Sequence, residues 1–255
     1  MPLFRYTLIL LTLLYAGLAD AAPAPVPAPP KVAASSYILM DYASGRVLAE
    51  KNSSQRLEPA SITKIMTAYT VLKEIQGGSV NLKDQTVVSE KAWRMPGSRM
   101  FIEVGSKLDV ETLLKGMIIQ SGNDASVALA EHVAGSEDAF AGLMNKHAQS
   151  LGMSDTNFVN STGMPDSQHL TTARDISKMA RATIREFPEF YSMYAIREFT
   201  HNNIKQYNRN KLLWRDKSVD GIKTGHTENA GYCLAASAKR NGMRLISVVM
   251  GTKSG

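Results

Sequence analysis

The stretch Glu58-Pro59-Ala60-Ser61-Ile62-Thr63-Lys64-Ile65-Met66 organises the rest of the chain. Pro59 predicts the start of a helix, because proline has no N–H to leave unpaired in a first turn. Apolar residues follow at helical spacing until Gly77-Gly78, where the pattern ends. Ser61 therefore lies in the first turn of a buried helix, and the Lys64 amine lies one turn further on the same side.

Ser61 and Lys64 have the arrangement of a nucleophile beside its own base. The dipole and the free N–H groups of a helix N-terminus favour developing negative charge on such a hydroxyl. Taken alone, the Ser-x-x-Lys spacing is weak evidence, because it is common and is better explained by a helix-capping serine and a solvated lysine. Two motifs further along the chain, Ser121-Gly122-Asn123 and Lys223-Thr224-Gly225, favour the catalytic interpretation.

The composition predicts a globular protein with a slightly basic surface. The 255 residues carry a net charge of +6 and 44% of them are hydrophobic, which suffices for one large core or two modest domains. No cluster of Lys and Arg is interleaved with aromatic residues, so we expect no nucleic-acid partner. The charge mildly favours anionic surroundings such as a cell-wall polymer, although a solvated basic surface also explains it.

The cysteine and histidine content indicates neither a disulfide nor a metal site. Cys233 is the only cysteine, and its apolar neighbours predict a buried core residue. The five histidines share no metal-ligand spacing with one another or with this cysteine. We therefore predict no metal, and the sequence gives no sign of a cofactor.

Residues 1–22 have the features of a secretory signal peptide. Arg5 supplies the positive start, residues 6–18 are apolar but short for a membrane span, and Ala19-Asp20-Ala21 is a small-x-small cleavage signal. An uncleaved N-terminal anchor is the alternative. Residues 23–33 predict an extended Pro/Ala linker, and residues 34–255 the folded domain. The protein is thus expected in the periplasm or on the outer face of the cytoplasmic membrane.

The order of the predicted elements indicates an α+β fold. A hairpin of two strands is predicted at 36–40 and 46–50, and helical patterns occupy the middle of the chain. Three more strands are predicted at 219–225, 230–238 and 243–251. Strands at both ends of the chain predict one antiparallel five-stranded sheet with a helical lobe inserted between its halves.

With its three motifs in this order, the chain resembles the low-molecular-mass penicillin-binding proteins, the serine-type D-alanyl-D-alanine carboxypeptidases of the peptidase S11 family. The resemblance covers about residues 34–251. It implies the β-lactamase/transpeptidase-like form of the predicted fold. It also implies an exported enzyme that removes the terminal D-alanine from peptidoglycan stem pentapeptides.

The resemblance assigns catalytic roles to three residues. Ser61 attacks the carbonyl between two D-alanines and forms an acyl-enzyme, and Lys64 takes its proton. Because an ordinary lysine is too basic for this role, burial and a second cation, Lys223, must lower the pKa of Lys64. Ser121 hydrogen-bonds Lys64 and relays the proton to the leaving D-alanine. The backbone N–H groups of Ser61 and His226 form the oxyanion hole.

The resemblance assigns substrate binding to the remaining positions. Asn123 holds the substrate amide, and Lys223 and Thr224 bind the terminal carboxylate, with Gly225 completing their motif. Arg209 adds positive charge near the site, although a surface ion pair would also explain it.

The same resemblance implies that β-lactam antibiotics acylate Ser61. Class A β-lactamases clear this adduct with a glutamate in a Glu-x-x-x-Asn loop, and the corresponding segment here, residues 160–166, contains no glutamate. We therefore expect slow release and covalent inhibition. Two alternatives stay open: an endopeptidase that cuts cross-links with the same residues, and a non-catalytic wall-binding module.

The end of the sequence departs from the pattern of the family. Members continue past the last strand into a helix that packs on the sheet, and many add a β domain and an amphipathic membrane anchor. This sequence stops at Gly255. We therefore expect a fragment or a truncated form, with one sheet face exposed and with membrane contact only through an anchor absent from this chain.

Overall fold

The computed structural model describes residues 28–29 and 31–254. Residues 33–254 belong to one compact unit. The predicted signal peptide and most of the predicted linker lie outside the described residues. Within the described part of the chain, no helix is both long and apolar enough to cross a membrane.

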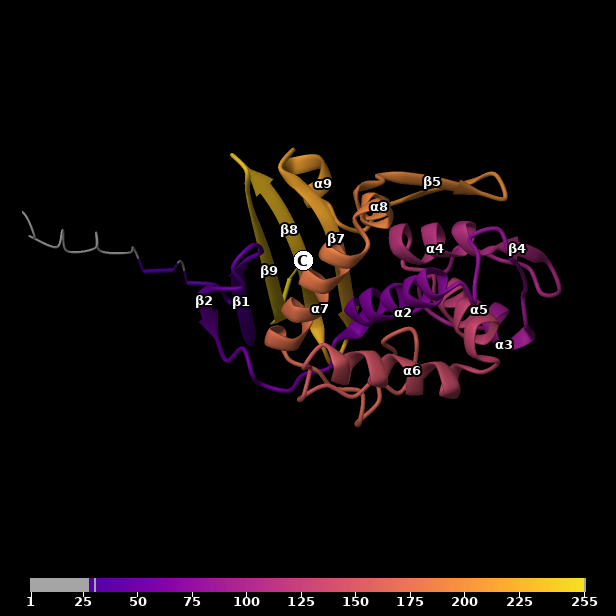
Figure 1. The fold of residues 1–255 in the computed structure, drawn as a ribbon, viewed down its shortest axis with the longest axis horizontal. Helices are drawn as coiled ribbons and strands as arrows, with labels where there is room; N and C mark the ends of the chain where they lie inside the picture. Colours follow the sequence, from indigo (N-terminus) through magenta and orange to yellow (C-terminus); the bar gives the residue numbers. More distant parts are fainter. Residues whose placement is uncertain (1–27, 30, 255) are drawn as a thin grey trace, which may run out of the picture. The chain divides into compact units, whose positions relative to one another are not determined.

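A five-stranded antiparallel sheet combines strands from both ends of the domain, as predicted. Its spatial order is β2-β1-β9-β8-β7 (Figure 1). The strands are β1 (Ser36–Asp41), β2 (Val47–Lys51), β7 (Val219–Thr227), β8 (Gly231–Arg240) and β9 (Met243–Thr252). Because β1 pairs with β9, the helical lobe is an insertion between β2 and β7.

The insertion consists of helices and two small two-stranded sheets. These sheets pair β3 (Gln85–Val87) with β4 (Lys107–Asp109), and β5 (Glu198–His201) with β6 (Ile204–Tyr207). The helices, in chain order, are η1 (Ala60–Thr63), α2 (Lys64–Gly77), α3 (Glu90–Trp93), α4 (Val110–Ile119), α5 (Asn123–Ala134), α6 (Glu137–Ser150), α7 (Ala173–Glu186), α8 (Pro188–Tyr191), η2 (Ser192–Ala195) and α9 (Leu212–Arg215).

Local sequence signals explain where three of the longer helices begin. Asp109, Ser136 and Thr172 precede α4, α6 and α7, and each side chain accepts a hydrogen bond from a backbone N–H of the first turn. Such caps satisfy donors that have no partner inside the helix. Helix α7 ends at Glu186, and Pro188, two residues further on, occupies the first position of α8.

Helix α2 is the central helix of the domain. Its first nine residues, from Lys64 to Leu72, are all buried, and it packs against α4, α5, α6 and α7. Figure 1 shows α2 running from the sheet into the helical lobe. The residues at its start are therefore held between the two parts of the fold.

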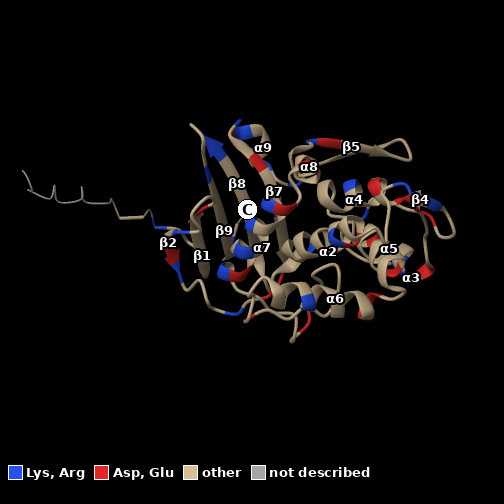
Figure 2. Ribbon diagram, viewed as in Figure 1, with Lys and Arg blue, Asp and Glu red and all other residues tan. Residues whose placement is uncertain are grey.

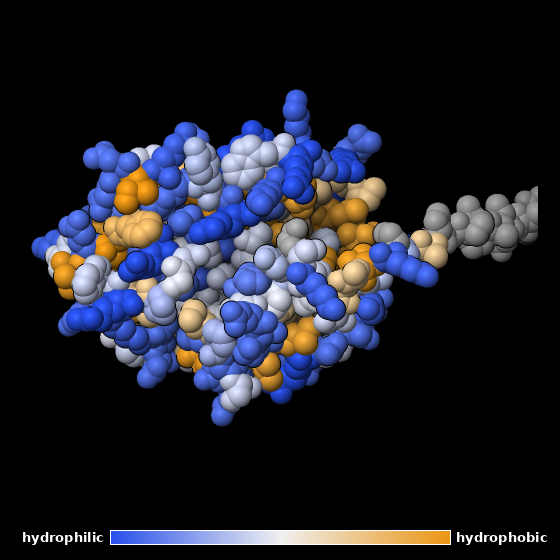
Figure 3. Space-filling model, turned by 180° about the vertical axis from the view of Figure 1, so that it is seen from behind, coloured by the Kyte–Doolittle hydropathy of each residue, from blue (hydrophilic) through white to orange (hydrophobic). Residues whose placement is uncertain are grey.

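The sheet has one covered face and one partly exposed face. Helix α7 packs on β1 and β9, where Ile38 and Val248 are buried. On the opposite face the register aligns Tyr37, Val249 and Leu234 in a row, and all three are half-buried. Figure 3 shows hydrophobic residues gathered over this side of the sheet.

The charged residues are spread over the surface. Lys and Arg alternate with Asp and Glu along the helices and the sheet edges (Figure 2). A typical pair joins Arg244 of β9 to Asp220 of β7 at 2.6 Å. The net charge of +6 therefore reflects a mixed surface rather than one basic stretch within the described residues.

Candidate active site

Ser61 lies in a single 3₁₀ turn, η1, that continues directly into α2. Pro59 precedes this turn, so the predicted helix start is present but begins with the tighter geometry. The Nζ atom of Lys64 lies 3.1 Å from Ser61 Oγ. Ser61 is half-buried, whereas Lys64 is only 1% exposed. A partly accessible hydroxyl thus stands over a buried amine.

Two further oxygens surround the Lys64 amine. Asn123 Oδ1 and the backbone carbonyl of Thr162 each lie 2.7 Å from Nζ. The orientation of the Asn123 amide follows from its second contact, in which Nδ2 donates to the carbonyl of Pro96 at 2.6 Å. Since a carbonyl can only accept, Nδ2 must face Pro96 and Oδ1 must face Lys64.

The environment favours the neutral form of Lys64. Burial and the nearby charge of Lys223 lower the pKa of Lys64 well below its ordinary value of 10.5, although two neighbouring carboxylates partly oppose this. A neutral amine has two N–H bonds and one lone pair. The two carbonyl-type oxygens take both N–H groups, so the lone pair faces Ser61 Oγ. This arrangement suits acceptance of the Ser61 proton.

Ser121 contacts Lys223 rather than Lys64. Lys223 Nζ donates to Ser121 Oγ at 2.9 Å. The expectation that Ser121 hydrogen-bonds Lys64 is therefore wrong, because Asn123 Oδ1 takes that place on the Lys64 amine. Ser121, which belongs to the second motif, is buried, and its hydrogen bond to Lys223 connects the second motif to the third.

The chain turns sharply between α4 and α5 at Ser121. Ser121 has the left-handed backbone, with φ of 69°, whereas Gly122 has φ of −57°. Position 122 requires glycine because of close packing, and not because of its backbone angles. A Cβ atom at Gly122 would lie 2.8 Å from Asp124 Oδ1 and 3.2 Å from the backbone N of Met100.

Strand β7 brings the third motif against the catalytic turn. A Cβ atom at Gly225 would lie 3.0 Å from both Ser61 N and Pro59 O, so glycine allows the strand to approach η1 this closely. The N–H of Ser61 belongs to the first turn, where intrahelical partners are missing. Thr224 is half-buried, and His226 is exposed, with its ring centroid 4.1 Å from that of Tyr232.

Lys223 also sits in an environment that opposes its charge. Burial, followed by the charge of Arg209, lowers the pKa of Lys223 to about 7. Arg209 is itself exposed. A carboxylate bound beside Lys223 would favour the charged form and raise this pKa again. The structure therefore brings together Ser61, Lys64, Ser121, Asn123 and Lys223, with Arg209 acting on them through its charge.

The role of Asp124 was not apparent from the sequence, although the residue directly follows Asn123. Its carboxylate is 1% exposed and accepts hydrogen bonds from the backbone N–H groups of Met100, Phe101 and Ile102, at 3.0, 2.9 and 3.3 Å. Asp124 thereby fastens the preceding loop to the start of α5. Its place beside the second motif was the only sequence signal for this role.

A second loop supplies the Thr162 carbonyl. Glu137, at the start of α6, accepts from the backbone N and the Oγ of Ser161 at 3.0 and 2.7 Å, and pairs with Lys91 at 2.9 Å. Asn160 Oδ1 accepts from the backbone N–H groups of Thr162 and Gly163 in the same loop. Because the functional atom belongs to the backbone, no residue type at position 162 could have identified it.

Substituting Gly163 by alanine is expected to destabilise the fold by about 2–4 kcal/mol. The residue has φ of 83°, and a Cβ atom there would lie 1.9 Å from the carbonyl oxygen of Ala60. Gly142, in the middle of α6, has no atom within 4 Å of such a Cβ. Gly142→Ala should therefore be neutral or stabilising by up to about 1 kcal/mol. Denaturant unfolding of both variants checks the prediction, and equal effects would contradict it.

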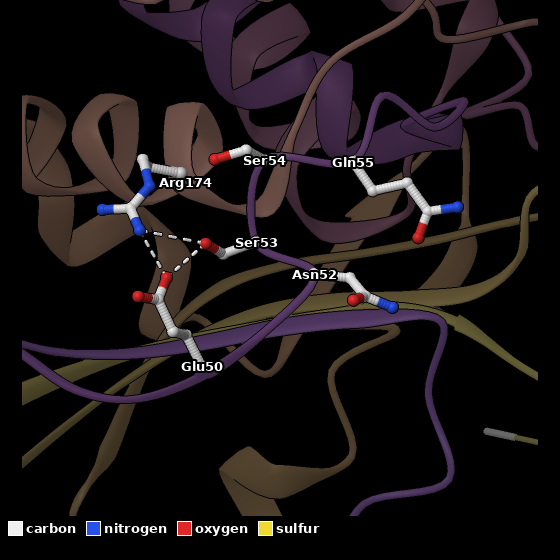
Figure 4. Close-up of a pocket in the computed structure, with 6 residues that line it drawn as sticks. All are labelled: Glu50, Asn52, Ser53, Ser54, Gln55 and Arg174. Carbon is white, nitrogen blue, oxygen red and sulfur yellow. Dashed lines mark hydrogen bonds and ion pairs between the residues drawn. The ribbon is translucent and has the colours of Figure 1, made fainter.

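Two hollows of the surface relate differently to this site. One, of about 680 Å³, is lined by none of the residues described above. In it Arg174 of α7 donates hydrogen bonds to Glu50 of β2 and to Ser53, two residues beyond that strand (Figure 4). The other, of about 580 Å³, has His226 and Glu58 in its wall and so borders the third motif.

The fold and the three motifs are those of penicillin-recognising serine enzymes. The chain belongs to the D-alanyl-D-alanine carboxypeptidase family, peptidase S11, which matches residues 23–254.

Named relatives of known sequence or structure agree with this assignment. The chain is 48% identical to the D-alanyl-D-alanine carboxypeptidase DacC of Escherichia coli over 94% of its own length and 62% of the relative. For DacA of the same organism the figures are 45%, 90% and 59%. Penicillin binding protein 5 from Haemophilus influenzae superposes with a TM-score of 0.88 at 44% identity, over 90% of this chain and 68% of that structure. The chain thus spans about three fifths of the length of these curated relatives.

Proposed function

We propose that the chain is the catalytic part of an exported serine D-Ala-D-Ala carboxypeptidase that removes the terminal D-alanine from peptidoglycan stem pentapeptides. The observation that supports this best is the Lys64 amine, whose two N–H groups have fixed acceptors and whose remaining position faces Ser61 Oγ. The intact site argues against a non-catalytic wall-binding module.

In the first step, Ser61 Oγ attacks the carbonyl carbon between the two D-alanines while its proton passes to Lys64. Negative charge develops on the carbonyl oxygen. The backbone N–H groups of Ser61 and His226 are proposed to stabilise it, at about 3–4 kcal/mol per donor. The close approach of Gly225 to Ser61 N supports this, because it brings β7 beside the first turn of η1.

In the second step, the tetrahedral intermediate collapses and D-alanine leaves with a proton. Ser121 is proposed as the relay: its Oγ gives a proton to the nitrogen of the leaving D-alanine and takes one from Lys223, to which it is hydrogen-bonded. Lys64 keeps the proton of Ser61 until the ester is hydrolysed. Lys223 and Thr224 would hold the carboxylate of the leaving residue, and Arg209 would add positive charge. The peptide is left as an ester on Ser61.

Asn123 is proposed to hold the substrate amide through the one donor that has no strong partner. One N–H of Nδ2 faces the Pro96 carbonyl, whereas only the sulfur of Met164 lies near Nδ2 otherwise, at 3.7 Å. Sulfur is a weak acceptor, so a substrate carbonyl would compete well for this group.

Water then hydrolyses the ester. Residues 160–166 contain no glutamate that would activate water as in class A β-lactamases. A β-lactam should therefore acylate Ser61 and leave slowly. We propose peptidoglycan stem peptides as substrates and β-lactams as covalent inhibitors. The segment 1–22 is proposed to direct export to the periplasm or the outer face of the cytoplasmic membrane, and 23–33 to link it to the catalytic domain at 34–255.

Release of free D-alanine from a stem pentapeptide tests this function. The chain is expected to release one D-alanine per peptide, and Ser61→Ala none. A cross-linked peptide dimer run in parallel separates the endopeptidase alternative, which would cut the dimer and spare the pentapeptide. A folded protein that binds penicillin reversibly and releases no D-alanine would favour the non-catalytic wall-binding module.

A further inference from the structure

His169 is a buried histidine that the proposed mechanism does not use. Its side chain is 1% exposed and lies at the end of the loop that carries Thr162. Nε2 lies 2.9 Å from Thr63 Oγ1, and Nδ1 lies 3.1 Å from the backbone N of Val159. The imidazole thus connects this loop to the turn that holds the catalytic serine.

The contacts of His169 fix its tautomer. The N–H of Val159 can only donate, so Nδ1 accepts and carries no proton. In a neutral imidazole the proton is then on Nε2, which donates to the Thr63 hydroxyl. Burial is the main reason why the pKa of His169 is lowered from 6.5 to about 4, so the ring is neutral at pH 7.

The loop meets the catalytic turn at a second point close by. A Cβ atom at Gly163 would lie 1.9 Å from Ala60 O and 2.8 Å from Thr63 Oγ1, so the two backbones are in direct contact there. The Thr162 carbonyl, one residue before this contact, accepts from Lys64. The position of that carbonyl therefore depends on how the loop is attached to η1.

We propose that His169 is a positioning residue for the acyl-enzyme chemistry, holding the Thr162 carbonyl against the Lys64 amine through its hydrogen bond to Thr63. The inference rests on the proposed function. The carbonyl is one of two acceptors that leave the lone pair of Lys64 facing Ser61, so a shift of this oxygen would turn the lone pair away. His169 is too deeply buried to touch a substrate, so the effect falls on rate and not on binding.

His169→Phe keeps a ring of similar size and removes both hydrogen bonds. Its kcat for D-alanine release should fall roughly 10- to 100-fold, with KM within about twofold. His169→Gln retains an amide N–H that can reach Thr63 and should recover most of the rate. End-point labelling with benzylpenicillin counts the folded sites in each preparation, so lost folding is separated from slower chemistry.

A double-mutant cycle tests the route of the effect. Thr63→Val removes the hydroxyl at nearly constant volume and should slow both acylation and D-alanine release. If the effect passes through the hydrogen bond, adding His169→Phe to Thr63→Val slows the enzyme no further. His147→Phe, in α6, alters a half-buried histidine that packs on Tyr69 of α2, and should leave kcat within about twofold.

The dependence of stability on acid pH tests the hydrogen bonds of His169, because a ring that only filled space would not make stability depend on pH. A protonated ring would place an N–H on Nδ1 facing the N–H of Val159. Since the folded pKa lies below the unfolded one, the stability contribution is complete above pH 6.5 and is lost as the pH falls toward 4. Asp166 and Glu137 raise the pKa of the ring, and Lys64 lowers it. The wild type should lose more thermal stability across this range than His169→Gln.

Two results would overturn the proposal. One is a His169→Phe variant with wild-type kcat and acylation rate and only a lower melting temperature. The other is a Thr63→Val variant without effect on either rate. If the wild type is acylated by penicillin but releases no D-alanine, the proposed function fails, and the acylation rate constants of the variants still test the role of His169.

Discussion

Lys64→Met is expected to slow acylation of Ser61 by benzylpenicillin by roughly 10²- to 10⁴-fold, the range for loss of a general base. Methionine has a similar length and suits a buried position, but it has no lone pair that can take the hydroxyl proton. It also leaves Asn123 Oδ1 and the Thr162 carbonyl without their donor. Stopped-flow or quenched measurements of the acylation rate constant check the prediction.

The control for this substitution is an exposed lysine in the same lobe. Lys146→Met, on α6, should leave acylation unchanged. Unfolding curves of both variants show whether the protein remains folded. A folded Lys64→Met variant that is acylated within about threefold of the wild-type rate would contradict the role of Lys64. The base would then have to be sought in the pair Ser121 and Lys223.

Asp124→Ala is expected to destabilise the fold by about 3–5 kcal/mol. Three backbone N–H groups, those of Met100, Phe101 and Ile102, would lose their shared acceptor in a buried place. Phe101 has a left-handed backbone, with φ of 67°, which these hydrogen bonds help to maintain. Denaturant unfolding measures the loss directly.

The matched control is Asp138→Ala, which removes an exposed carboxylate from the first turn of α6. Its loss should reduce the free energy of unfolding by about 0.3–1 kcal/mol, through the helix dipole alone. Similar values for the two variants would show that the backbone N–H groups near Asp124 find other partners. The hydrogen bonds to Asp124 would then not be what holds residues 100–102 in place.

The arrangement of the sheet could be predicted because its signals are local. The strands alternate or form short apolar runs, and Asn241-Gly242 gives the tight turn between β8 and β9, with positive φ at both residues. The helix starts were equally local, as the caps at Asp109 and Thr172 illustrate. Sequence order alone then placed the first and last strands in one sheet.

The contacts inside the site could not be predicted in the same way. Ser121 and Lys223 are 102 residues apart, and whether the serine meets this lysine or Lys64 depends on where the turn before α5 lies relative to β7. The motifs identified the residue types but not their pairing. The oxygen of Thr162 and the contact of His169 with Thr63 depend on a loop whose path no residue pattern specified.

The most direct test of the central claim is the mass of the intact protein after incubation with benzylpenicillin, followed by peptide mapping. We expect one stable adduct of a single penicillin, located on the peptide that contains Ser61 and absent in Ser61→Ala. A cooperatively folded protein that gains no mass, or that carries the adduct on another peptide, would contradict the assignment of Ser61 as the nucleophile.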